Sequence, residues 1–91
     1  MTTLTKEERM SLLGETFGLS LPGVYPWDAG RLEKSLGVLS SGEYQTAVFL
    51  LSVWNHHDFG NKFNMHEALH IWDDDRRAAF HAWTKRPWWW A

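Results

Sequence analysis

His66, Glu67 and His70 are the residues of this chain whose types and spacing could carry out a reaction. Together they form the pattern H-E-x-x-H, and residues four positions apart lie on one face of a helix. Two imidazoles on one face can bind a zinc ion, and the glutamate between them can take a proton from a metal-bound water. The pattern therefore indicates metal binding, or a minimal zinc-dependent peptide hydrolase.

The residues around this pattern favour a structural role. The resemblance to the zincin motif covers five residues only, because Asp73 and Arg76 stand where the metzincin continuation requires glycine and histidine. Asn64 has the type of a helix N-cap, and Glu67 would complete a capping box by accepting a hydrogen bond from the Asn64 backbone. A glutamate used in this way is not aimed at a metal-bound water, so we expect neither enzymatic activity nor a cofactor.

A metal site would also need a third ligand. The candidates are His81, an aspartate of the run 73–75, and His56 or His57. On a continuous helix His81 would lie on the same stripe as His70, because eleven residues are about three helical turns. If the chain binds a metal, we expect its ligands to be His66, His70 and His81.

The chain ends in an aromatic tail, residues 86–91, that follows a basic segment. Its three consecutive tryptophans cannot all face one core, because adjacent side chains point apart in helices and strands alike. Some indole surface should therefore be exposed or held by a partner, unless two indoles pack on the domain and one stays half-buried. Tryptophan and arginine dominate the energetics of protein interfaces. We expect the binding residues to be Arg77, Lys85, Arg86, Trp88, Trp89 and Trp90.

Cations next to aromatic rings can also bind single-stranded nucleic acid, since bases stack on rings and phosphates pair with cations. The chain as a whole does not attract nucleic acid, because it has 9 Lys and Arg against 11 Asp and Glu, a net charge of −2. The acidic run 73–75 can also pair locally with Arg76 and Arg77. Weak binding of single-stranded nucleic acid is therefore only an alternative.

Length and composition set the class of protein. Ninety-one residues form one domain, 1–91, whose core depends on large rings, with 7 Trp, 5 Phe and 2 Tyr. The chain has no cysteine, so disulfides and thiolate sites are excluded. The N-terminal segment has no apolar signal region, and no run approaches the roughly 20 apolar residues of a membrane span. We therefore expect a cytoplasmic protein that does not enter membranes.

Helix start and stop signals predict an all-α bundle of about five short helices. Residues with the type of an N-cap precede each one: Thr5, Asp28, Ser40, Asn64, and Asp73 or Asp74. Gly18 and Gly37 have the type that ends the first two in a left-handed conformation. The helix over 41–54 is apolar on nearly its whole circumference, so it should be central, with the C-terminal helix packed across it. Residues 18–27 are expected to be an apolar loop and 55–62 a polar connection.

These features together predict a small, non-enzymatic protein-binding domain that acts as a regulator, adaptor or inhibitor. Its partner would be another protein, and a homo-oligomer is an open alternative. A compact, slightly acidic domain without cysteine is also typical of inhibitors encoded by phages or mobile elements.

Overall fold

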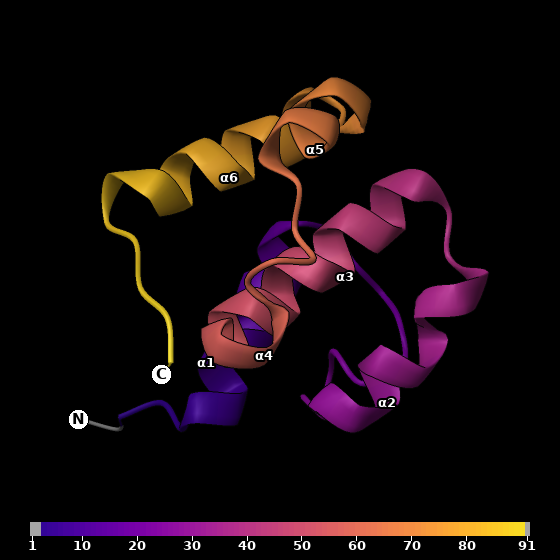
Figure 1. Cartoon of the computed structure of the whole chain (residues 1–91). Helices are drawn as coiled ribbons and strands as arrows, with labels where there is room; N and C mark the ends of the chain where they lie inside the picture. The colour runs from indigo at the N-terminus through magenta and orange to yellow at the C-terminus, as the bar shows by residue number, and fades with distance from the viewer. Residues whose placement is uncertain (1–2, 91) are drawn as a thin grey trace.

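The computed structural model describes residues 3–90, and this part of the chain is all-α (Figure 1). Its helices are α1 Lys6–Thr16, α2 Ala29–Ser35, the short 3-10 helix η1 Leu36–Val38, α3 Ser41–Trp54, α4 His56–Phe59, α5 Met65–Ile71 and α6 Asp74–Lys85. Helix α3 runs through the middle, and α5 and α6 lie together on one side of it. The start of α1 lies near the end of the described chain, where Lys6 contacts the Trp90 ring. The predicted helical bundle is confirmed. Residue 91 of the predicted tail lies outside the described residues.

Side-chain caps begin the helices at the predicted positions. Thr5 and Ser40 form complete capping boxes, in which each hydroxyl accepts from the backbone N–H of a glutamate three residues later and that carboxylate accepts from the cap backbone. Asp28, Asn64 and Asp73 cap α2, α5 and α6 through a side-chain oxygen. Each such cap contributes about 1 kcal/mol, which matters for helices this short.

The capping box of α1 also changes the ionisation of Glu8. The hydrogen bond from the Thr5 backbone N–H, followed by the bond with the Thr5 side chain, lowers the pKa of Glu8. Because the pKa is lower in the folded chain than in the unfolded chain, this contribution to stability is present at neutral pH. It is lost as the pH falls through the folded-state pKa.

One predicted helix end was wrong, and one short helix was not predicted. Gly37 does not end α2 in a left-handed conformation, since positive φ values occur at Gly18 and Gly23, and the chain passes Gly37 inside η1. Residues 55–62 are not only a connection, because the Asn55 side chain accepts from the backbone N–H of Asp58 and starts α4. A helix of four residues is too short to show an apolar repeat, so the sequence pattern could not reveal it.

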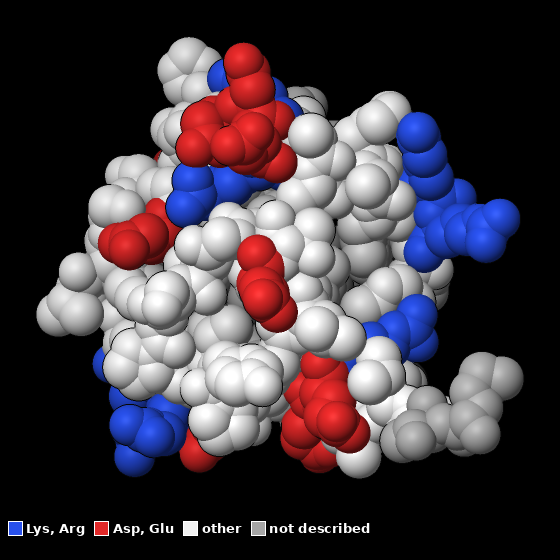
Figure 2. All heavy atoms as spheres, turned by 180° about the vertical axis from the view of Figure 1, so that it is seen from behind, with Lys and Arg blue, Asp and Glu red and all other residues white. Residues whose placement is uncertain are grey.

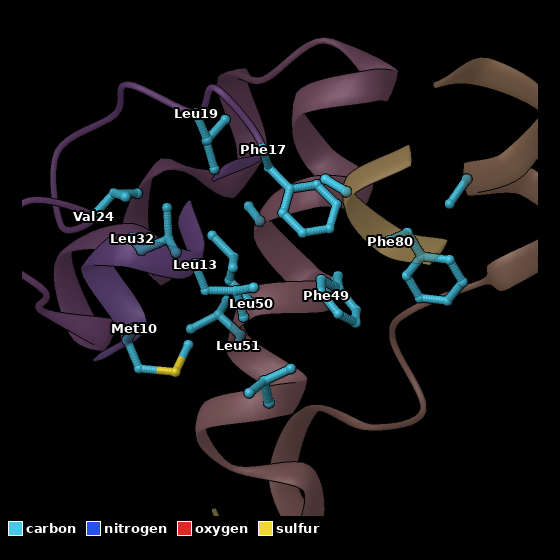
Figure 3. Close-up of a cluster of buried hydrophobic side chains, with 14 of the residues drawn as sticks. Met10, Leu13, Phe17, Leu19, Val24, Leu32, Phe49, Leu50, Leu51 and Phe80 are labelled. Carbon is cyan, nitrogen blue, oxygen red and sulfur yellow. The ribbon is translucent and has the colours of Figure 1, made fainter. Parts of the chain in front are cut away.

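Phe49, in the middle of α3, is the centre of the aromatic core. Its ring packs at centroid distances of 5.0 to 6.4 Å on the rings of Phe17, Phe63, Trp72, Phe80 and Trp83. Figure 3 shows Phe49 between Phe17 and Phe80, with the aliphatic part of the core on the other side of α3. One side chain thus connects the end of α1 with the segments around α5 and α6.

Trp72 joins α5 to α6 and is fully buried. Its indole N–H donates to Thr46 Oγ1 at 2.8 Å, and the Thr46 hydroxyl donates to the Gly42 carbonyl at 2.8 Å. The buried indole therefore keeps a hydrogen-bond partner, which avoids the cost of an unpaired donor in the core.

Within residues 3–90, no helix has both the length and the apolar character needed to cross a membrane.

Replacing Phe49 by alanine tests the aromatic core. We expect Phe49→Ala to lower the free energy of unfolding by about 3–5 kcal/mol, because it leaves a cavity that several rings border. Val38→Ala, at an exposed position, should change it by less than about 0.5 kcal/mol. Urea unfolding followed by circular dichroism measures both values, and similar stabilities for the two variants would contradict the central role of Phe49.

Candidate protein-binding surface

The C-terminal tail, residues 86–90, folds back along the domain after α6 (Figure 1). The Trp83 indole N–H donates to the Trp88 carbonyl at 3.2 Å, and the Trp90 backbone N–H donates to the Val53 carbonyl at 2.7 Å. The Val53 carbonyl lies in the last turn of α3, where carbonyls have no partner within the helix. The tail therefore closes the C-terminal end of the central helix.

Two cations of α1 hold the tail from the other side. The Arg9 guanidinium lies 3.9 Å from the centre of the Trp88 ring, and the Lys6 ammonium lies 5.4 Å from that of Trp90 and 4.4 Å from that of Trp54. Cation–π contacts of this kind contribute roughly 0.5–2 kcal/mol each. Sequence reasoning missed Lys6 and Arg9, because no local pattern links them to residues some eighty positions later.

Trp89 is the exposed member of the tail. The residue is 57% exposed, whereas Trp88 and Trp90 are half-buried. The rings of Trp88 and Trp90 pack edge to face at 5.8 Å, as side chains two residues apart in an extended segment can. The residue between them consequently points away from the domain. The tail thus presents one indole to solvent from a backbone that is anchored on both sides.

Two positively charged residues precede this indole in the chain. Lys85 ends α6 and Arg86 follows it, both side chains are exposed, and neither forms an ion pair within residues 3–90. Figure 2 shows basic side chains along the edge of the molecule where α6 ends. We refer to Trp89, Lys85 and Arg86 as the C-terminal surface.

Arg77 does not belong to the C-terminal surface. It lies eight residues before Lys85, which is about 12 Å along a helix. Its Nε donates to the Leu69 carbonyl at 2.8 Å, and its Nη1 lies 3.4 Å from the Asp74 carboxylate. Leu69 is in the last turn of α5, so Arg77 caps that helix and connects it to α6.

The structure separates the histidines of the H-E-x-x-H pattern from His81. Trp72 has an extended conformation, with ψ of 144°, so α5 and α6 are separate helices and their residues do not form one stripe. His66, His70 and His81 are all exposed. Among residues 3–90, no three His, Asp or Glu side chains come together in a way that could hold a metal ion.

The predicted capping box at Glu67 was only half right. The Asn64 side chain accepts from the Glu67 backbone N–H at 3.0 Å, as expected. The Asn64 backbone N–H, however, donates to Gln45 Oε1 of α3 at 3.2 Å instead of to the Glu67 carboxylate. A buried glutamine from a distant helix thus replaces the local partner, which leaves the Glu67 carboxylate exposed.

Comparison with known proteins does not identify a relative: no protein-family model matches the chain, and neither a curated protein nor a solved structure shows significant similarity. The fold defines the chain as a small helical domain, and its function is inferred from the chemistry of its surface.

The contact between Arg9 and Trp88 can be tested by a double-mutant cycle. Trp88→Ala should destabilise the domain by about 2 kcal/mol, less than the 3–5 kcal/mol of a fully buried tryptophan because the ring is half-exposed. Arg9→Ala, Trp88→Ala and the double variant should give a coupling energy of about 0.5–1 kcal/mol. Thermal and urea unfolding measure these values. Additive effects would show that the two side chains do not interact in solution.

Proposed function

We propose that this chain is a non-enzymatic protein-binding domain, a regulator, adaptor or inhibitor, whose contact residues are Trp89, Lys85 and Arg86. The observation that carries the proposal is the exposed indole of Trp89 on an anchored tail. A tryptophan removes roughly 150–250 Å² of surface from water when it is buried. A partner that covers an exposed tryptophan therefore gains a large favourable free energy of binding.

Because the tail is anchored, less conformational entropy is lost when a partner binds this indole. A free C-terminal segment would lose its conformational freedom on binding, and that loss opposes association. Here the hydrogen bond from Trp90 to Val53 and the stacking of Trp88 on Arg9 have already fixed the backbone. Trp89 is therefore preorganised, in the way that interface residues with large contributions usually are.

The two cations that precede Trp89 in the chain indicate the chemistry of the partner. Lys85 and Arg86 carry positive charge that no carboxylate within residues 3–90 pairs with. A matching surface would offer an apolar pocket for the indole, bordered by carboxylates. Such complementary charges mainly increase the association rate, so binding should weaken as the salt concentration rises.

The nucleic-acid alternative has less support from this arrangement. Lys6 and Arg9 face tryptophan rings, and Arg76 and Arg77 pair with Asp73 and Asp74. Four of the nine Lys and Arg side chains are thus already engaged within the domain, which reduces the number of phosphates that the chain can neutralise and therefore the expected affinity for nucleic acid.

Trp89→Ala tests the proposal with a closely matched control. The immobilised wild-type chain is used to capture partners from a lysate of the organism that encodes it, and the affinity for each captured protein is measured by titration. We expect Trp89→Ala to fold with unchanged stability and to bind at least about 30-fold more weakly, as for an interface residue worth 2 kcal/mol or more. Met65→Ala, which shortens an apolar side chain of similar exposure on α5, should bind like the wild type.

Equal affinity of Trp89→Ala and Met65→Ala for the captured partner would overturn the proposed role of the C-terminal surface. A variant Lys85→Glu, Arg86→Glu extends the comparison. It should slow association and remove most of the salt dependence, because it removes the positive charge beside the indole.

A further inference from the structure

A second hollow surface, partly apolar and partly polar, lies between α1 and the loop that follows it. The loop between α1 and α2 folds over this helix and leaves a cavity of about 890 Å³, whose apolar walls include Leu12, Leu19, Val24 and Tyr25. A smaller hollow of about 320 Å³ continues from Leu12 and Tyr25 to Leu4. We call the two together the α1 groove. Its size is in the range of cavities that hold a ligand or a large side chain.

The walls of the α1 groove are fixed before anything binds. The buried Ser11 hydroxyl donates to the Val24 carbonyl at 2.7 Å, which holds the loop on α1. A Cβ atom on Gly14 would lie 2.5 Å from Val24 Cγ1, so only glycine allows the loop to approach this closely. Gly23 has a φ of 96°, and a Cβ there would lie 2.5 Å from the Leu32 backbone N. The loop is thus a preformed wall.

Large apolar side chains are exposed along the rim of this groove. Tyr25 is 81% exposed, Leu4 49% and Leu12 45%. They form one patch, since all three border the smaller hollow. A contiguous apolar patch of this kind usually marks a surface that another molecule covers.

The charge of the α1 groove is opposite to that of the C-terminal surface. Glu15 borders the larger cavity and Glu7 and Glu8 the smaller one, against a single cation, Arg31. Within residues 3–90 none of these carboxylates forms an ion pair. Helix α1 lies behind α3 in Figure 1 and so faces the viewer in Figure 2, where acidic side chains border an uncharged surface. The groove therefore suits an aromatic side chain with cations beside it.

We infer that the α1 groove binds the C-terminal surface of a second copy of this chain, with Trp89 in the groove and Lys85 and Arg86 beside its carboxylates. This inference rests on the proposed function of Trp89 and names its partner. The occupant has the chemistry that the groove requires, and both surfaces are preformed, so little order is lost on association.

Trp89 does not fill the groove of its own chain. It lines neither hollow, and its backbone is held by the stacking of Trp88 on Arg9 and by the hydrogen bond from the Trp90 N–H to the Val53 carbonyl. We therefore place the contact between copies. Because it joins two different surfaces, it is a head-to-tail contact, which extends into rings or open chains instead of stopping at a symmetric dimer.

Sedimentation equilibrium of the purified chain, from micromolar to millimolar concentration at low salt, tests this inference. The expected result is a weight-average mass that rises with concentration above the 10.6 kDa of one chain. Trp89→Ala removes the inserted side chain, and Leu12→Lys places a cation on the rim of the groove. Each variant alone should need at least tenfold higher concentration to associate, with an unchanged circular dichroism spectrum.

An equimolar mixture of the two variants gives the decisive result. The Trp89→Ala copy keeps its groove and the Leu12→Lys copy keeps its tryptophan, so the mixture should form a dimer that does not grow further. A wild-type chain that stays monomeric at all concentrations would overturn the inference. So would association that Leu12→Lys leaves unchanged, because the tryptophan would then contact another surface.

The outcomes also separate this inference from the proposed function. A monomeric wild type together with loss of a captured partner in Trp89→Ala would leave the proposed function in place and remove only self-association. If Trp89→Ala changed neither partner capture nor mass, both would fail.

Discussion

The central constraint on this domain is that α3 must be covered on every side. All residues from 45 to 53 are buried, which is unusual for a helix in so small a protein, because most helices face solvent along one side. Helices α1 and α2 cover its aliphatic side, and the rings around α5 and α6 pack on Phe49. The remaining elements are short, and each is placed by the part of α3 that it covers.

The C-terminal tail follows from the same constraint. The last turn of α3 exposes unpaired carbonyls, and the backbone of Trp90 supplies a donor for the carbonyl of Val53. Trp88 and Trp90 face the domain, where the cations of α1 lie over their rings. Trp89 points outward as a consequence of this packing. The exposed indole is therefore a product of the way the tail closes the domain, and this gives it a fixed position from which to bind.

Local signals in the sequence predicted the helix starts and the central helix well. The caps at Thr5 and Ser40 depend on residues three positions apart, so the sequence alone contains the information. The failures involve distant partners, such as Gln45, which takes the place of Glu67 at the start of α5. For the candidate site, the sequence indicated that the three tryptophans differ in exposure, but only the fold shows which of them is outside.

Amide hydrogen exchange in the tail, measured by NMR, tests most directly whether the tail is anchored with Trp89 outside. The backbone N–H of Trp90 donates to Val53, whereas within residues 3–90 that of Trp89 donates to no backbone carbonyl. The Trp90 amide should therefore exchange on the order of 100-fold more slowly than the Trp89 amide. Equally fast exchange of both, at the rate of an unstructured peptide, would show a free tail and contradict the preorganised binding surface.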